Sequence, residues 1–224
     1  SFRFIRETNL MYQTLLAAEA RAVLGREVAT LTAADLSRLV DAEDLEAFFP
    51  SSLLVPSFRE FLGGVGLTLA TVGGDTIRID ASDRPEKYGR AACLPVTIPD
   101  DIRISVRPSG GPVDFETLFH EGGHALHFAN SPAAPWELSR LGPAALSEGI
   151  GALFGGVWED PAWLARYGAF VRQSGGATPV LSDRDAARAA RRRVLRDLYL
   201  FRRLAGARLL FETILHGGDP ELYR

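Results

Sequence analysis

The segment that organises this chain is Asp114–Asn130, with the sequence DFETLFHEGGHALHFAN. It contains the pattern H-E-x-x-H, in which His120 and His124 are four positions apart. On a helix this spacing places the two imidazoles one above the other, so both can reach a single metal ion. Zinc favours imidazole nitrogen as a ligand. Glu121 would point beside the ion, where it can act as general base toward a water molecule.

The residues around the motif predict one helix. Asp114 is a candidate N-cap after the break at residues 110–112, and Asn130-Ser131-Pro132 is a stop signal. One stripe at helical spacing is apolar, and a second, beside it, contains three of the four histidines. The apolar stripe is Phe115, Leu118, Phe119, Ala125, Leu126 and Ala129, and the second is Thr117, His120, His124 and His127. This combination is typical of a helix that lines a buried site.

Gly122 and Gly123 lie inside this predicted helix. Each glycine costs on the order of 1 kcal/mol relative to alanine. We therefore expect another part of the protein to approach the backbone closely there. The alternative to a metal site is a pair of structural histidines, His120 and His124, that happen to flank a glutamate.

Glu148 is the candidate for the third metal ligand. It follows His124 by 24 positions and is the only charged residue between Leu141 and Trp158. A break at Gly142-Pro143 predicts a second helix over residues 144–158. The residues expected on its Glu148 face are all small: Ala144, Ala145, Gly151, Ala152 and Gly155. We expect this face to pack against the glycines of the first helix. A seam of small residues with one buried, protonated glutamate is the alternative.

Residues 114–148 resemble the metal site of the thimet oligopeptidase and oligoendopeptidase F family, which are zinc metallopeptidases with two histidines and one glutamate as ligands. The matching residues are Thr117, Leu118, His120, Glu121, Gly123, His124, Ala125, Leu126, His127 and Glu148. Upstream, Asp80 and residues 87–92 (KYGRAA) resemble the family's aspartate and K-x-x-G-A stretch. The resemblance covers residues 80–160. Gly122 departs from the bulky residue often found at that position, which would widen or loosen the site.

The resemblance implies a zincin-like catalytic domain that hydrolyses peptide substrates with Zn²⁺ as cofactor. It assigns the zinc ligands to His120, His124 and Glu148, and the general base to Glu121. Members of the family continue into a tyrosine- and histidine-bearing segment that stabilises the oxyanion, for which this chain shows no counterpart. Tyr167 and Tyr199 are available tyrosines, but nothing in the sequence places them near the metal.

The chain ends soon after a fresh helix start at residues 219–222, so we expect it to be truncated at the C-terminus. Two alternatives to an active peptidase follow. The chain is a pseudo-peptidase that keeps zinc as a structural ion, or it is half of an enzyme that needs the missing C-terminal segment or a companion polypeptide.

Composition sets the outer limits. The 224 residues, 46% hydrophobic and 24% charged, predict a single globular domain over 1–224. A net charge of −3 gives no reason to expect nucleic acid or an anionic membrane as a partner. Cys93 is the only cysteine, so no internal disulfide can form and a cytoplasmic location is expected. No apolar run is long enough to cross a membrane.

The overall pattern predicts a mainly α fold with a small antiparallel β-sheet, of the α+β class. We expect a helical scaffold over 1–64, the sheet over 65–108 and the helical metal-site region over 112–224. The predicted strands are 67–71, 76–79, 92–98 and 102–106. A peptide could add to an edge of such a sheet as a further strand.

Helical signals continue on both sides of the metal-site region. The predicted scaffold helices are 8–25, a capped helix from Thr32, 42–49 and 51–62, and the later ones are 160–173 and 182–216. The last helix contains an arginine run that we interpret as a solvated face, with a peptide carboxylate or a partner segment as alternative ligands. The run is Arg184, Arg188, Arg191, Arg192, Arg193 and Arg196.

Overall fold

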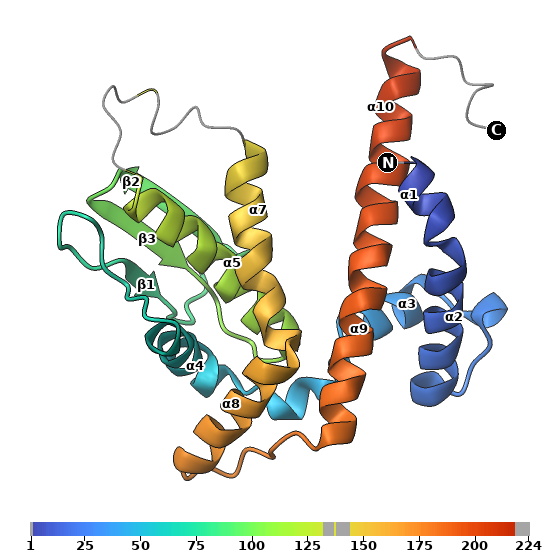
Figure 1. Cartoon of the computed structure of the whole chain (residues 1–224), viewed down its shortest axis with the longest axis horizontal. Helices are drawn as coiled ribbons and strands as arrows, with labels where there is room; N and C mark the ends of the chain where they lie inside the picture. The colour runs from blue at the N-terminus through green and yellow to red at the C-terminus, as the bar shows by residue number, and fades with distance from the viewer. Residues whose placement is uncertain (1, 132–136, 138–143, 218–224) are drawn as a thin grey trace. The chain divides into compact units, whose positions relative to one another are not determined.

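A computed structural model describes residues 2–131, 137 and 144–217 (Figure 1). The chain forms two compact units, Leu45–Ala186 and Ser1–Asp44 with Ala187–Arg224, which we call the central and the terminal unit. The prediction of one domain did not anticipate this division, and assignment of the whole chain to one metallopeptidase domain stays a prediction. The helix start at residues 219–222, the stop at Pro132 and the break at 142–143 lie outside the described residues.

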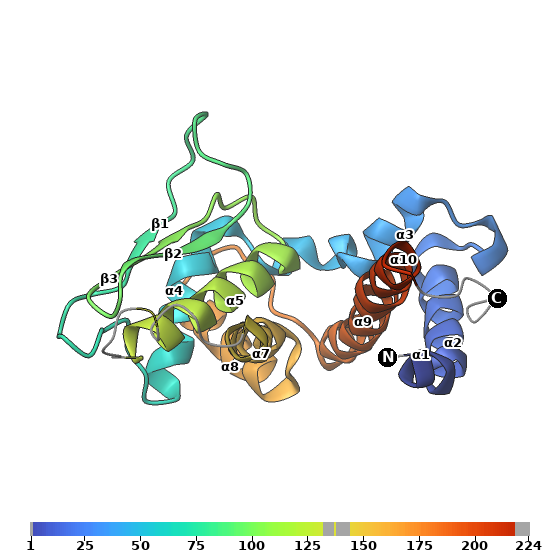
Figure 2. The same ribbon diagram turned by 90° about the horizontal axis from the view of Figure 1, so that it is seen from above.

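The central unit is built around helix α5, which packs against the sheet and against helix α7 (Figures 1 and 2). Its helices are α4 (Ser51–Gly64), α5 (Pro112–Ala129), α7 (Ala144–Gly155), the 3₁₀ turn Gly156–Glu159 and α8 (Pro161–Gln173). Its strands are β1 (Arg78–Asp80), β2 (Ala92–Thr97) and β3 (Asp101–Ser105). The fold is therefore mainly helical with a small sheet, as predicted for the α+β class.

The sheet is mixed rather than wholly antiparallel, which corrects the prediction. Strands β2 and β3 form the predicted antiparallel pair, but β1 lies parallel to β3 on its other side, in the order β1-β3-β2. The connection from β1 to β2 is held by Lys87, whose buried Nζ donates to the carbonyls of Asp80, Ser82 and Val106. The hairpin predicted over 67–79 is reduced to one bridge between Ala70 and Thr76.

Helix α5 begins three residues earlier than the N-cap predicted at Asp114 implies. Gly111 is its N-cap, with φ of 91°, and Pro112 occupies the first helical position. Asp114 lies in the first turn, where its carboxylate accepts hydrogen bonds from the backbone N–H groups of Ser109 (2.5 Å) and Gly110 (2.6 Å). The carboxylate therefore ties down the loop before the helix instead of capping the helix itself.

Aromatic side chains form the core that fixes α5 in place. Phe49 packs edge-on against Phe115 and Trp158 and stacks on Tyr167. Phe119 contacts Phe58 of α4 and Trp163 of α8 in the same edge-on manner. Buried aromatic pairs add about 0.5–1.5 kcal/mol to the stability expected from the area that they bury. This cluster therefore stabilises the position of α5, the helix that contains the histidines.

In the terminal unit, early and late segments of the chain pack together. Its elements are α1 (Phe2–Glu7), α2 (Asn9–Glu19), a π-helical turn (Ala20–Leu24), the 3₁₀ turns Val28–Thr30 and Glu43–Phe48, α3 (Ala33–Val40), α9 (Asp183–Phe201), a π-helical segment (Arg202–Arg208) and α10 (Leu209–Leu215). The 3₁₀ turn Glu43–Phe48 runs on into the central unit. The predicted capping box at Thr32 and Asp35 is confirmed.

The arginine run of α9 is not a solvated face, which corrects that interpretation. Arg192 is only 1% exposed, and its guanidinium donates to the carboxylate of Glu19, itself 2% exposed, at 2.6 Å. Arg196 pairs with Asp41, and Arg188 with Asp44. The exposed members of the run are Arg184 and Arg191, and Arg191 also pairs with Glu19. The run therefore attaches α9 to the first helices of the chain by buried and half-buried ion pairs.

Candidate metal centre

The close approach expected between the two motif helices is present. A Cβ added at Gly123 would lie 2.9 Å from the carbonyl oxygen of Ile150 and 3.1 Å from the Cα of Gly151. One added at Gly155 would lie 3.2 Å from the Cβ of His120. Real Cβ atoms essentially never come within 3.0 Å of another atom, so α5 and α7 can reach this separation only because Gly123 lacks a side chain. The contact at Gly155 would be tighter than nine in ten real Cβ contacts.

The three predicted ligands converge between these helices. The Nε2 atoms of His120 and His124 are 3.0 Å apart, and the carboxylate oxygens of Glu148 lie 3.5 Å and 3.7 Å from them. Two ligand atoms about 2.0–2.2 Å from a zinc ion at tetrahedral angles are roughly 3.3–3.5 Å apart. The observed separations bracket this value. The three side chains could therefore hold one metal ion.

Burial differs sharply among the three. The side chain of His124 is 11% exposed and that of His120 is 30% exposed, but the carboxylate side chain of Glu148 is 67% exposed. The expectation that Glu148 avoids a solvated face was wrong, because its small helical neighbours leave the carboxylate uncovered. The alternative of a buried, protonated glutamate fails for the same reason. Within the described residues, the side of the cluster formed by Glu148 is thus accessible to solvent. A catalytic metal site needs such access for a water molecule or substrate.

His124 is held in a state suited to metal binding. Burial, reinforced by the neighbouring His120, lowers the pKa of His124 below its ordinary value of 6.5. At neutral pH the imidazole is therefore uncharged and retains a ring lone pair. Its Nδ1 lies 2.8 Å from the hydroxyl oxygen of Ser147, the residue before Glu148 on α7. The second ring nitrogen is thus occupied while Nε2 faces the other two ligands.

Glu121 does not join the ligand cluster. Its Oε2 instead accepts a hydrogen bond of 2.6 Å from the backbone N–H of Cys93, on edge strand β2. Cys93 is half-buried, and burial together with the charge of Glu121 raises the pKa of its thiol to about 12. Among the described residues, the group that could hold a metal ion is His120, His124 and Glu148, without Cys93.

The departure of Gly122 from the family pattern had suggested a wider or looser site, and this prediction was wrong. A Cβ at Gly122 would lie 2.1 Å from Cζ of Phe58, so the glycine faces the aromatic core. Phe58 fills the space that a bulky side chain would take.

Other candidates from the sequence have structural contacts. Lys87 and Asp80 form a salt bridge of 3.0 Å, which secures the turn before β2. Tyr167 is buried and donates its hydroxyl proton to the carbonyl of Phe48 at 2.8 Å, so it is committed to the core. The Nδ1 of His127 is buried without a hydrogen-bond partner among the residues that the structure describes.

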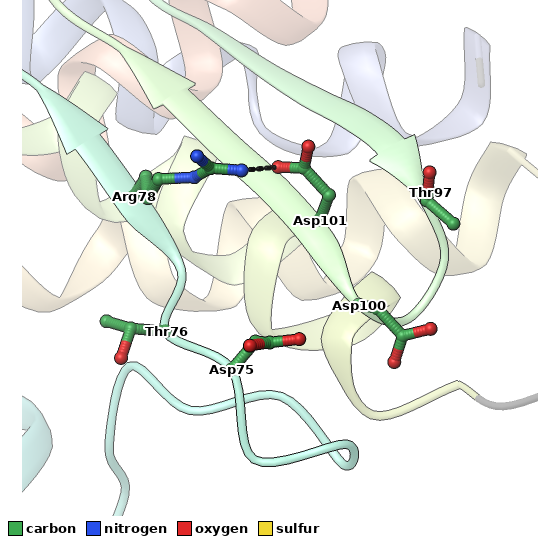
Figure 3. A pocket seen from close by; sticks show the side chains of 6 residues that line it. All are labelled: Asp75, Thr76, Arg78, Thr97, Asp100 and Asp101. Carbon is green, nitrogen blue, oxygen red and sulfur yellow. Dashed lines mark hydrogen bonds and ion pairs between the residues drawn. The ribbon is translucent and has the colours of Figure 1, made fainter.

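A hollow of about 520 Å³ lies at the end of the sheet, and its lining includes none of the four candidate site residues (Figure 3). Across it Arg78 donates to Asp101 at 2.6 Å. Its lining residues are Asp75, Thr76, Arg78, Thr97, Asp100 and Asp101.

Two contacts of the site were missed from the sequence, the Ser147 hydroxyl and the Cys93 amide. The position of Ser147 next to Glu148 was a usable signal, because a residue that adjoins one ligand on a helix can face a second ligand on the neighbouring helix. The backbone amide of Cys93 carries no side-chain signal at all.

None of the described helices is long and apolar enough to cross a membrane. Comparison of the chain with protein-family models, with curated proteins and with solved structures gave no match.

Proposed function

We propose that this protein is a zinc-dependent peptidase with a zincin-like site, of the kind found in the thimet oligopeptidase and oligoendopeptidase F family. The observation that carries the proposal is the meeting of His120, His124 and Glu148 at separations that fit a tetrahedral ion. The adjacent Glu121 supports it, because a carboxylate beside such a cluster, rather than in it, suits a general base. The cytoplasmic location expected from the lone cysteine is part of this proposal.

The residues divide the work between binding and proton transfer. A bound Zn²⁺ supplies a water molecule of lowered pKa and polarises the carbonyl of the peptide bond. Glu121 takes a proton from the attacking water and passes it to the leaving amine. Its Oε2 is held by the Cys93 N–H, so the carboxylate keeps a fixed orientation and its other oxygen remains available for the proton.

The edge strand next to Glu121 offers a place for the substrate. Among the strands that the structure describes, β2 lies at the edge and pairs with β3 alone, and it carries the amide that contacts Glu121. A peptide that added to this edge as a further strand would lie beside the general base. Recognition would then rest mainly on backbone hydrogen bonds, which favours a broad range of peptide sequences.

A zinc-binding protein without catalysis is the second candidate, and the position of Tyr167 favours it. The hydroxyl of Tyr167 is bound within the aromatic core and cannot reach a substrate at the metal centre. On this reading, an oxyanion donor would be supplied by a further segment of the same protein or by a companion polypeptide.

The decisive experiment compares the protein with Glu121→Gln in a quenched-fluorescence peptide assay with added zinc. The glutamine carbonyl can still accept the Cys93 hydrogen bond, so the fold and the zinc content should be unchanged. Hydrolysis should fall by about 10²–10⁴-fold, the usual contribution of a general base. Full activity in the variant would exclude Glu121 from catalysis. Zinc binding with no hydrolysis, both alone and after the chain is extended, would favour the non-catalytic candidate.

A further inference from the structure

Within the described part of the chain, the polar partner of His124 outside the ligand cluster is the hydroxyl of Ser147. Its Oγ lies 2.8 Å from Nδ1 of His124, and Ser147 is the residue immediately before Glu148 on α7. The same short helical segment therefore touches the metal centre twice, once through a carboxylate and once through a hydroxyl.

The geometry determines which atom donates when a metal is bound. Nε2 of His124 faces His120 Nε2 at 3.0 Å and the Glu148 carboxylate at 3.7 Å, so Nε2 is the ligand atom. A ligating nitrogen must offer its lone pair, which leaves the proton of the neutral ring on Nδ1. Nδ1–H then donates to Ser147 Oγ. Ligating histidines commonly have such a partner, which selects the tautomer and orients the ring.

We propose that Ser147 is a positioning residue of the metal centre, whose hydroxyl accepts the Nδ1–H of His124 and holds Nε2 toward the ion. The inference rests on the proposed function for the presence of a metal. It assigns to Ser147 a role that is distinct from those of the three ligands and of Glu121.

Packing makes this contact consequential. His124 is largely buried, so its Nδ1–H has limited access to water if the hydroxyl is removed. An unsatisfied buried donor costs about 1–3 kcal/mol. The close approach of Gly123 to Ile150 and Gly151 fixes the register of α7 on α5, which keeps Ser147 opposite the ring. The ring would have to rotate to find another acceptor, and rotation would turn Nε2 away from Glu148.

The test is a zinc titration of Ser147→Ala against a competing chromophoric chelator, with the metal ion alone as ligand. Without a metal the proton of the His124 ring can sit on Nε2, which faces Nε2 of His120 at 3.0 Å, so the metal-free variant leaves no buried donor unpaired. Alanine is also the better helix former, so the metal-free variant should be folded and about as stable to heat as the wild type. Zinc affinity should fall by about 10–100-fold, the usual effect of losing such a partner. Ser147→Thr keeps a hydroxyl and should restore most of the affinity. Leu146→Ala, at an exposed neighbour on the same helix, is the matched control and should leave affinity unchanged.

Nitrogen-15 NMR of the His124 ring adds a readout that a purely structural role would not change. The wild-type zinc complex should show a protonated Nδ1 in slow exchange with water, and Ser147→Ala should show faster exchange of that proton. Unchanged affinity and unchanged exchange in Ser147→Ala would overturn the inference while leaving the metal site intact. A wild-type protein that binds no zinc would overturn the proposed function, and this inference with it.

Discussion

At the residue scale, the metal centre depends on a glycine that faces the histidine rings. A Cβ at Gly151 would lie 2.9 Å from Nε2 of His120 and 3.0 Å from Nε2 of His124. It would enter the space between the two ring nitrogens that face the ion. The glycine therefore keeps that space free, in addition to letting the helices approach.

This predicts opposite results for two neighbouring substitutions in α7. Gly151→Ala should weaken zinc binding by about tenfold or more, the scale set by disturbing a ligand's surroundings, because the new methyl group displaces the imidazoles. Gly149→Ala should leave zinc affinity unchanged, since a Cβ there meets no atom within 4 Å, and should raise helix stability by about 0.5–1 kcal/mol. Calorimetric zinc titration and thermal unfolding measure both effects. Equal zinc affinities in the two variants would contradict the placement of the ion beside Gly151.

The candidate site was largely predictable at this scale, and its supporting contacts were not. The spacing of His120 and His124 and the isolation of Glu148 in an apolar helix were enough to name three ligand candidates that the structure brings together. The exposure of Glu148 could not be predicted, because it depends on what covers the helix rather than on the residue itself. The Ser147 and Cys93 contacts join residues 23 and 28 positions apart, a proximity that only the packing of the helices and the sheet creates.

At the element scale, helix α5 is positioned by a fit between a glycine and an aromatic ring. Gly122 receives the ring of Phe58 from α4, and the same ring contacts Phe119 one turn earlier on α5. The two helices can pack at this distance only while one partner is small and the other is large.

Gly122→Ala should therefore destabilise the fold, despite the better helix propensity of alanine. The added methyl group overlaps the Phe58 ring, and overpacking of this kind costs about 1–3 kcal/mol. Combining it with Phe58→Leu should recover part of the loss, so the two changes should be non-additive in a double-mutant cycle followed by denaturant unfolding. Gly63→Ala is the control, because a Cβ there meets no atom within 4 Å. Additive effects of the two core changes would argue against direct contact between Gly122 and Phe58.

The helices and the β2-β3 hairpin followed from sequence pattern, but the pairing of β1 did not. Alternation of apolar residues indicates a strand and its buried face, and it does not say which neighbour the strand joins. The parallel pairing of Ile79 with Ile104 needs the chain to cross from one edge of the sheet to the other between β1 and β2. The buried Lys87, bound to three carbonyls, is the contact that secures this crossing.

At the scale of the whole molecule, the terminal unit depends on a buried ion pair between its first and last parts. Glu19 and Arg192 are 173 positions apart, and the pair is almost inaccessible to solvent. Burial alone raises the pKa of Glu19, but hydrogen bonds and charge from Arg192 and Arg191 outweigh it, so the pKa lies below its ordinary value of 4.5. The arginine run was interpreted as solvated because helical spacing cannot reveal a partner so distant in sequence.

Glu19→Gln should destabilise the terminal unit by about 3 kcal/mol, because Arg192 would lose its main buried partner. A carboxyl whose folded pKa is depressed adds stability above its unfolded pKa and loses it as the pH falls through the folded value. The wild type should therefore lose stability below pH 4.5 more steeply than the variant, in urea unfolding followed by circular dichroism across pH. Glu27→Gln, which removes an exposed partner of Arg21, is the control and should change little. Parallel pH profiles for the wild type and Glu19→Gln would show that this pair does not govern acid stability.

The central claim is that His120, His124 and Glu148 bind one ion together, and the exposed Glu148 is its most demanding part. The most direct measurement is zinc affinity, with bound metal quantified by elemental analysis, for the wild type, Glu148→Gln and the exposed control Glu212→Gln. The wild type and the control should bind about one zinc ion per chain equally tightly, as expected for three side-chain ligands. Glu148→Gln should bind at least about tenfold more weakly, since even an outer contact is worth that much. Unchanged affinity in Glu148→Gln, or a wild-type protein that retains no zinc, would contradict the claim.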